Sequence, residues 1–219
     1  MAKGGSFDAL SVLREYLRQV REALTAVSEE EVLRIAEALL LARRRGSTVY
    51  LLGNGGSAST ASHAANDLTK TGSVEGGPAL RTVSLPDNVS MLTAWANDTS
   101  FENIFSAQLE VLLRPGDLVV VISGSGNSPN VLRAVETARK MDAMSVGLAG
   151  FAGGRLREMA DLSVVVPGVA QGPIEDVHLI LVHVLTGILK RAALEEMATA
   201  PVAVGAGRRN DGQEVESWS

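Results

Sequence analysis

The sequence lacks cysteine altogether and has few aromatic residues. Of its 219 residues none is cysteine, and aromatic residues make up 4%. The first absence excludes disulfide frameworks, thiolate nucleophiles, iron–sulfur clusters and cysteine-ligated zinc, so that any metal must be held by His, Asp, Glu or Gln. The second leaves few side chains on which nucleobases could stack. The hydrophobic core must therefore be built from Ala, Val, Leu and Ile, as is common in α/β folds.

Positive charge and long apolar runs are also scarce. Lys and Arg number 20 against 25 Asp and Glu, and the formal net charge of −5 disfavours binding to nucleic acid. The cluster Arg43-Arg44-Arg45 falls at the end of a predicted helix, where cations meet the negative end of the helix dipole. No signal-peptide pattern and no uncharged apolar run near the ~20 residues of a membrane span are found. We expect a cytoplasmic protein without nucleic-acid or membrane partners.

Two amphipathic helices are predicted before the first strand. In residues 8–26, leucine and valine recur at spacings of three and four, which is typical of a helix that packs against a partner. Ser28 and Glu31 form a capping-box pattern that opens a second helix, and Gly46 closes it. These helices are candidates for a bundle between subunits. The apolar seam of the first comprises Leu10, Leu13, Leu17, Val20 and Leu24.

After residue 47 the pattern changes to strands that alternate with helices, which predicts an α/β fold with a parallel sheet. We expect one domain over residues 1–200, N-terminal helices 8–45 included, and a disordered tail over 201–219, where Gly and charge occur without periodicity. The predicted strands are 48–52, 79–85, 117–122, 144–149 and 162–166. The predicted helices that follow the first strand are 57–70, 88–96, 101–113, 128–141, 154–160 and 174–197.

Two glycine-rich loops are candidates for binding an anion. Residues 53–57 and 123–128 each connect a predicted strand to the start of a helix, where backbone N–H groups are free. Taken alone, each loop could equally be a tight turn that needs glycine. In an open parallel sheet, however, two such loops can face one crevice and hold one phosphorylated molecule. Neither loop has a nucleotide-binding fingerprint, which favours a sugar phosphate.

All three histidines lie in two predicted helices, together with two acidic residues. His63 and Asp67 are four residues apart, and Glu175 and His183 are two turns apart on the last helix. If the helices meet, two imidazoles and two carboxylates suit a divalent ion. The alternative is that these histidines are ordinary core or interface residues. His178 is expected mainly to pack or to form a hydrogen bond at an interface.

Four segments together resemble one family. GNGGSASTASHAANDL at 53–68, ANDTSFENIF at 96–105, ISGSGNSPNVL at 122–132 and IEDVHLILVHVL at 174–185 are similar to the SIS-domain phosphoheptose isomerases, which convert sedoheptulose 7-phosphate to a glycero-manno-heptose 7-phosphate. The resemblance covers roughly residues 8–197. It implies a flavodoxin-like SIS domain, with a central parallel sheet flanked by helices. It also implies a homotetramer with the N-terminal helices in a central bundle and active sites at subunit interfaces.

The resemblance also implies a set of substrate-binding residues. Serines of the two loops would hold the phosphate, and polar residues around them would contact the sugar chain. The full set is Asn54, Gly55, Ser57, Asn97, Asp98, Ser123, Gly124, Ser125, Ser128 and Glu175.

A zinc site and the catalytic residues follow from the same resemblance. Zinc would be held by His63, Asp67, Glu175 and His183, and the last three would also be catalytic. Isomerisation needs a base that moves a carbon-bound proton, which is either Asp67 or Glu175, and an acid for the oxygens, for which His183 is suited. Four positions depart from the family: Asp67 replaces Glu, Glu175 replaces Gln, Gly172 replaces Asp and Gly124 replaces Thr.

Three functions remain possible at this point. The first is the isomerisation of sedoheptulose 7-phosphate through an enediolate. The second is a non-catalytic SIS protein that binds a phosphosugar or another protein. The third is isomerisation of another sugar phosphate, such as a hexose or an amino sugar.

Overall fold

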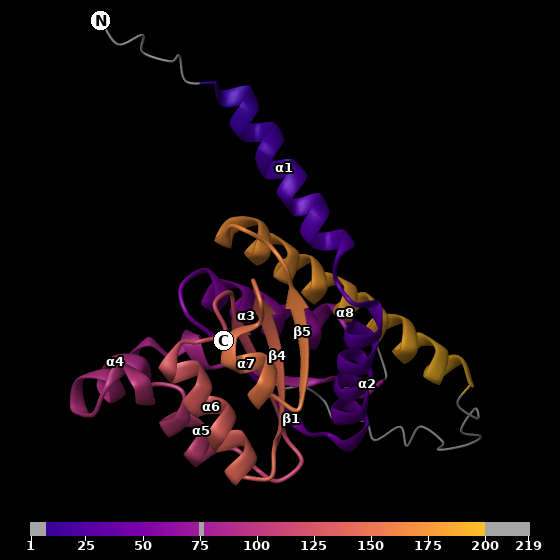
Figure 1. Cartoon of the computed structure of the whole chain (residues 1–219). Helices are drawn as coiled ribbons and strands as arrows, with labels where there is room; N and C mark the ends of the chain where they lie inside the picture. The colour runs from indigo at the N-terminus through magenta and orange to yellow at the C-terminus, as the bar shows by residue number, and fades with distance from the viewer. Residues whose placement is uncertain (1–7, 75–76, 200–219) are drawn as a thin grey trace, which may run out of the picture.

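A sheet of five parallel strands forms the centre of the computed structural model, which describes residues 8–74 and 77–199 (Figure 1). The strand order is β2-β1-β3-β4-β5, as in flavodoxin-like folds, and it confirms the predicted architecture. The chain reverses its direction across the sheet at β1, so the crevice between the ends of β1 and β3 is the expected ligand site. The strands are β1 Thr48–Gly53, β2 Arg81–Ser84, β3 Leu118–Ser123, β4 Met144–Gly150 and β5 Leu162–Val166.

Eight α-helices are found in the described part of the chain, close to the predicted positions. Two predictions were wrong in detail. The helix expected over 57–70 changes to a π-helical turn at Asp67–Thr71, and the one expected over 101–113 is broken after a 3₁₀ turn at Phe101–Asn103, where Ile104 and Phe105 enter the core. The helices are α1 Ala9–Thr25, α2 Glu29–Arg45, α3 Gly56–Asn66, α4 Val89–Asp98, α5 Ser106–Leu112, α6 Pro129–Lys140, α7 Gly154–Met159 and α8 Gln171–Thr199.

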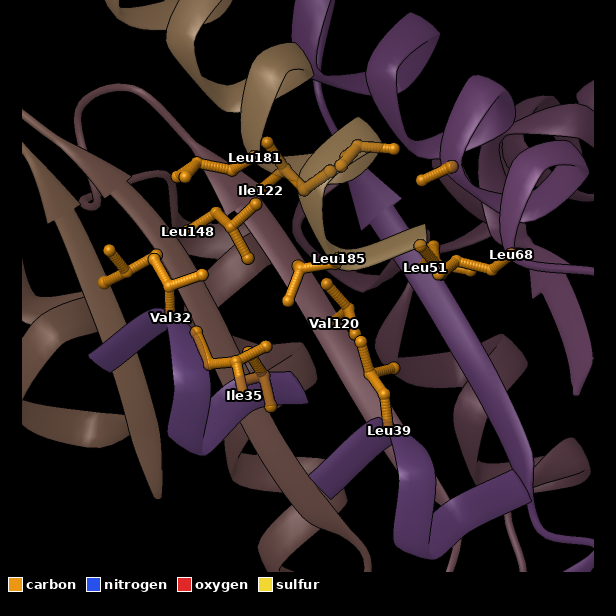
Figure 2. Close-up of a cluster of buried hydrophobic side chains, with 14 of the residues drawn as sticks. Val32, Ile35, Leu39, Leu51, Leu68, Val120, Ile122, Leu148, Leu181 and Leu185 are labelled. Carbon is orange, nitrogen blue, oxygen red and sulfur yellow. The ribbon is translucent and has the colours of Figure 1, made fainter. Parts of the chain in front are cut away.

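Both faces of the sheet are buried, because side chains of β3 alternate between two hydrophobic clusters. Leu118, Val120 and Ile122 point to the face covered by α2, α3 and α8, and Val119 and Val121 point to the face covered by α5, α6 and α7. Figure 2 shows the first cluster, in which leucines of α8 and apolar residues of α2 meet the strands. The well-packed sheet fixes the positions of the loops at its carboxyl edge.

The predicted start and end of α2 are confirmed, but the apolar seam of α1 is largely exposed. Ser28 accepts a hydrogen bond from the backbone N–H of Glu31, and Gly46 ends α2 with φ of +68°. Helix α1 projects from the body (Figure 1), and four of its seam leucines are 42–55% exposed. This helix thus offers an apolar stripe to a partner.

Helix α8 is long and packs against α1, α2 and α3. It begins three residues earlier than predicted, at Gln171, because Pro173 fits within a first turn whose N–H groups need no partner in the helix. It is the one helix in the described ranges that is long and apolar enough to cross a membrane. Its apolar residues, Leu181 and Leu185 among them, belong to the core (Figure 2), as in a core helix of a soluble protein. The proposed tail, 201–219, lies outside the described residues, and the single-domain organisation stays a prediction.

Candidate functional site

The two glycine-rich loops lie side by side at the carboxyl ends of β1 and β3, as predicted. Gly53 pairs with Ile122 in the sheet, so both chains leave it at the same level. A reciprocal pair of amides then ties the loops together: Asn54 donates to Asn130 over 2.9 Å, and Asn130 donates to Asn54 over 2.8 Å. Asn130 is buried, in the first turn of α6. The amide of Asn54, which was predicted to contact the sugar, is therefore engaged within the protein.

The first loop is shaped to present a helix N-terminus. Gly55 has φ of +55°, a backbone conformation that favours glycine, and it directly precedes α3. Ser57 is buried in the first turn of that helix, at the end of the helix with free N–H groups and positive partial charge. This arrangement is typical of anion sites.

The second loop carries three hydroxyl groups at different depths. Ser123 is buried and accepts a hydrogen bond from the backbone N–H of Gly126, whereas Ser125 is exposed and accepts one from the N–H of Asn127. Ser128 occupies the N-cap position of α6, but its hydroxyl makes no capping bond. The loop can therefore offer hydroxyls and the N-terminus of α6 to the same anion that meets Ser57.

A second group of polar side chains lies further along α3 and α8. The Nε2 atoms of His63 and His183 are 3.0 Å apart, and Oδ2 of Asp67 lies 3.1 Å from the first and 3.7 Å from the second. Asp67 begins the π-helical turn, and its other oxygen accepts a hydrogen bond from Asn66. Such turns occur frequently at functional sites. The two imidazoles are about half exposed, so a ligand can reach them.

The geometry of this group fits a divalent metal ion such as zinc. In a tetrahedral zinc site with bonds of 2.0–2.1 Å, neighbouring ligand atoms are roughly 3.3 Å apart. The three separations of 3.0, 3.1 and 3.7 Å bracket this value. Two ring nitrogens this close need a proton or a cation between them, because their lone pairs repel each other. His63, Asp67 and His183 thus form a suitable three-ligand set, the number of protein ligands found in catalytic zinc sites.

Glu175, the fourth predicted ligand, lies outside this group of three. Its carboxylate lies against Gly56 at the start of α3, so close that a Cβ atom on that glycine would be 2.5 Å from Oε2. The same carboxylate accepts a hydrogen bond from Gln171 over 2.8 Å. Helices α3 and α8 run in the same direction, because Glu175 meets Gly56 and, two turns later, His183 meets His63. Glu175 is therefore at the phosphate end of the site, between the two loops.

His178 is a core residue of α8. It is fully buried, its Nε2 lies 3.1 Å from the carbonyl oxygen of Ala149, and its Nδ1 has no hydrogen-bond partner among the described residues. Burial lowers the pKa of its imidazole, which outweighs the opposite effects of the Ala149 carbonyl and of Glu175. The residue is neutral near pH 7 and agrees with the packing role expected for it.

Asn97 and Asp98 lie at the end of α4, apart from these groups. Both are exposed, and the amide of Asn97 donates a hydrogen bond to Asp98 over 2.8 Å. Helix α4 buries no residue and stands at the margin of the molecule (Figure 1). A role of these two side chains in substrate binding stays a prediction.

Three residues of the site were missed by the sequence analysis. Asn130 and Asn66 act on predicted residues through their amides, and Gln171 was placed before the last helix. Two had a usable signal: Asn66 directly precedes Asp67, and Gln171 precedes Glu175 by one helical turn. Asn130 had none, because its partner is 76 positions away in the sequence.

Comparisons with known proteins agree with the fold and the site. Residues 15–150 match the family model described as SIS domain. The chain is 38% identical over 177 residues to the phosphoheptose isomerase of Chlorobaculum parvum, covering 80% of this chain and 85% of that one. It is 42% identical over 149 residues to the phosphoheptose isomerase of Rhodospirillum rubrum, covering 68% and 79%.

Solved structures of phosphoheptose isomerases have the same fold. The phosphoheptose isomerase of Neisseria gonorrhoeae superimposes with a TM-score of 0.76 at 32% identity, covering 83% of this chain and 96% of that one. The phosphoheptose isomerase from Francisella tularensis superimposes with a TM-score of 0.79 at 28% identity, covering 84% and 100%.

Proposed function

The chain belongs to the SIS-domain family of phosphoheptose isomerases and is a sugar-phosphate isomerase, and from this premise we propose how its residues act on sedoheptulose 7-phosphate. The observation that carries the proposal is that two polar groups lie about two turns apart along α3 and α8. One end has two helix N-termini with serines, and the other has the group of His63, Asp67 and His183. A phosphate suits the first end, and a ketose or aldose carbonyl suits the second.

The phosphate is held by both loops. Ser57, Ser125 and Ser128 supply hydroxyls, and the N-termini of α3 and α6 supply backbone N–H groups and positive partial charge. Ser123 holds the second loop in shape through Gly126. The amide pair of Asn54 and Asn130 holds the two loops at a fixed separation.

Zinc suits the group of His63, Asp67 and His183, and when bound there it would supply positive charge that polarises the carbonyl oxygen of the substrate. Asp67 is already engaged with two imidazoles and with Asn66. Either Asp67 or Glu175 moves the proton between carbons; Asp67 lies at the carbonyl end beside the two imidazoles, and Glu175 lies at the phosphate end, bonded to Gln171. His183 can exchange the proton between the two oxygens when its Nε2 is not bound to metal.

A homotetramer and a cytoplasmic location complete the proposal. The exposed leucine stripe on α1 supports association through the N-terminal helices, because apolar stripes of this size are normally covered. The negative net charge supports a small anionic substrate bound locally by helix ends and speaks against nucleic acid as a partner.

The decisive experiment follows sedoheptulose 7-phosphate in deuterated water with the full chain, with and without added zinc. We expect the aldose 7-phosphate to form and solvent deuterium to enter at C2. The variants Asp67→Asn and Glu175→Gln, made separately, assign the base, because only loss of the acid that transfers the proton should abolish exchange while substrate affinity changes little. Binding of the phosphosugar without turnover or exchange would refute catalysis and favour the non-catalytic SIS protein, and turnover of only a hexose phosphate would favour the third function.

A further inference from the structure

A pair of threonine hydroxyls ties the π-helical turn of the site to the edge strand β2. Oγ1 of Thr82, on β2, lies 2.7 Å from the carbonyl oxygen of Ala65 and 2.6 Å from Oγ1 of Thr69. Oγ1 of Thr69 also lies 3.0 Å from the carbonyl oxygen of Leu80, just before the strand. The two shorter contacts make a chain in which Thr69 donates to Thr82 and Thr82 donates to Ala65. Strand β2 therefore holds the chain on both sides of Asp67.

Asp67 stands midway between the two residues that Thr82 contacts. Ala65 is two positions before it, and Thr69 is two positions after it. Within this segment the π turn begins, and the N–H of Gly72 donates to the carbonyl oxygen of Asp67 over 2.9 Å. Hydrogen bonds between residues five apart are rare in helices. The threonine pair is a contact from outside the helix that stabilises this uncommon turn.

The position of the turn decides where the carboxylate of Asp67 lies. An aspartate side chain is short, so a shift of its backbone is passed on to its oxygens. Oδ2 lies 3.1 Å from Nε2 of His63 and 3.7 Å from Nε2 of His183, and the side chain is only 17% exposed. Metal sites tolerate deviations of about 0.2 Å in their ligand distances. A small movement of the turn would therefore take the carboxylate out of the ligand set.

Resting on the isomerase function and the zinc group above, we propose that Thr82 is a positioning residue for Asp67. Its hydroxyl, together with that of Thr69, fixes the π turn so that the carboxylate reaches both imidazoles. Among the described residues, Thr82 has no hydrogen bond to the three ligand side chains, so it acts through the backbone. Loss of a residue that orients a metal ligand changes metal affinity or activity by about 10- to 100-fold.

Zinc affinity of the full-length chain tests the proposal without measuring turnover. Wild type, Thr82→Val and Thr82→Ser are titrated with zinc against a competing dye, at a temperature where circular dichroism shows all three folded. Thr82→Val keeps the β-branched shape but loses the hydroxyl, and should weaken zinc binding about tenfold or more. Thr82→Ser keeps the hydroxyl and should stay within about threefold of the wild type. Equal affinities of wild type and Thr82→Val, or a serine variant as weak as the valine variant, would overturn the proposal.

A double-mutant cycle distinguishes one shared chain of bonds from two separate effects. Thr69→Val should weaken zinc binding by a similar factor and should add little in the Thr82→Val background, because both substitutions break the same chain. Effects that simply multiply would contradict the proposal.

Tyr50→Phe is the matched control. The hydroxyl of Tyr50 donates to the carbonyl oxygen of Leu112 over 2.9 Å, so this variant also loses a bond from a strand hydroxyl to a carbonyl of another element. Tyr50 lies on the neighbouring strand β1 but in the opposite hydrophobic cluster from Val49, with which Thr82 pairs. The control should keep the zinc affinity and kcat of the wild type. A loss of zinc affinity equal to that of Thr82→Val would overturn the proposal.

Steady-state kinetics with sedoheptulose 7-phosphate give the second readout and separate this proposal from the proposed function. Thr82→Val should lower kcat about tenfold and change KM less than about threefold, because the phosphate-binding loops are unaffected. If the wild type isomerises or binds zinc and Thr82→Val matches it in both measurements, the role of Thr82 is refuted and the isomerase function stands. If the wild type neither isomerises nor binds zinc, the proposed function fails, and the role of Thr82 fails with it.

Discussion

Replacing His178 by glutamine should show how much of the pH dependence of stability comes from this buried imidazole. The imidazole is fully buried, and burial lowers its pKa below the ordinary value of 6.5. Below pH 6.5 the unfolded chain takes up a proton that the folded chain does not, so the free energy of unfolding falls as the pH falls. From pH 7.5 to pH 5.5 this loss reaches at most about 1.4 kcal/mol, because only the pH unit between 6.5 and 5.5 lies below the ordinary pKa, and one unit is worth about 1.36 kcal/mol.

The assay is urea unfolding of both proteins at pH 7.5 and at pH 5.5, with a chelator present and at one protein concentration. The variant His178→Gln keeps an N–H donor for the carbonyl of Ala149 but has no group that titrates. His63 and His183 are present in both proteins, so their contributions cancel in the difference. We expect the wild type to lose about 1 kcal/mol relative to the variant on acidification. A difference in unfolding free energy that stays constant, or that grows in favour of the wild type, would refute the reasoning.

Two further predictions concern contacts that hold the site and α8 in place. Asn130→Ala removes both bonds to Asn54. We expect the free energy of unfolding in urea to fall by about 2 kcal/mol and the KM for the sugar phosphate to rise. An unchanged KM would contradict the role of the pair in spacing the loops. Arg43→Met removes a buried guanidinium that bonds Pro78 and Glu196, and should cost about 2 kcal/mol in the same assay. Arg44→Met, an exposed partner of the same Glu196, should cost less than about 0.5 kcal/mol, and equal losses in the two variants would contradict the argument from burial.

The sheet and the two loops could be predicted because their signals are local. Residues 118–122 are all apolar, which indicates a strand buried on both faces, and glycine with serine directly after a strand indicates a turn into a helix. The topological rule for parallel sheets then places both loops at one crevice without any further information. To predict the group of His63 and His183, one further assumption was needed, namely that the two helices meet. The spacing of the four candidate ligands suggested it.

The contacts between distant side chains could not be predicted. That Asn54 contacts the sugar stays a prediction, and its amide also bonds Asn130, far away in the sequence, at both ends. Glu175 was expected among the metal ligands on its spacing and on the family resemblance, which stays a prediction, and spacing along a helix does not say which neighbour a flexible side chain will contact. Its contact with Gln171 depends on where α8 begins, and helix ends are the least certain part of any sequence pattern.

The fixed separation between the phosphate end and the histidine end of the site lets the protein select its substrate by length. Ser57 and His63 are six residues apart on the same helix, which corresponds to roughly 9 Å. A sugar anchored by its phosphate therefore presents different carbons to the group of His63, Asp67 and His183 according to how many carbons it contains. Because a misplacement of about 1 Å can cost a hundredfold in rate, discrimination between five-, six- and seven-carbon chains needs no contact with any individual hydroxyl group.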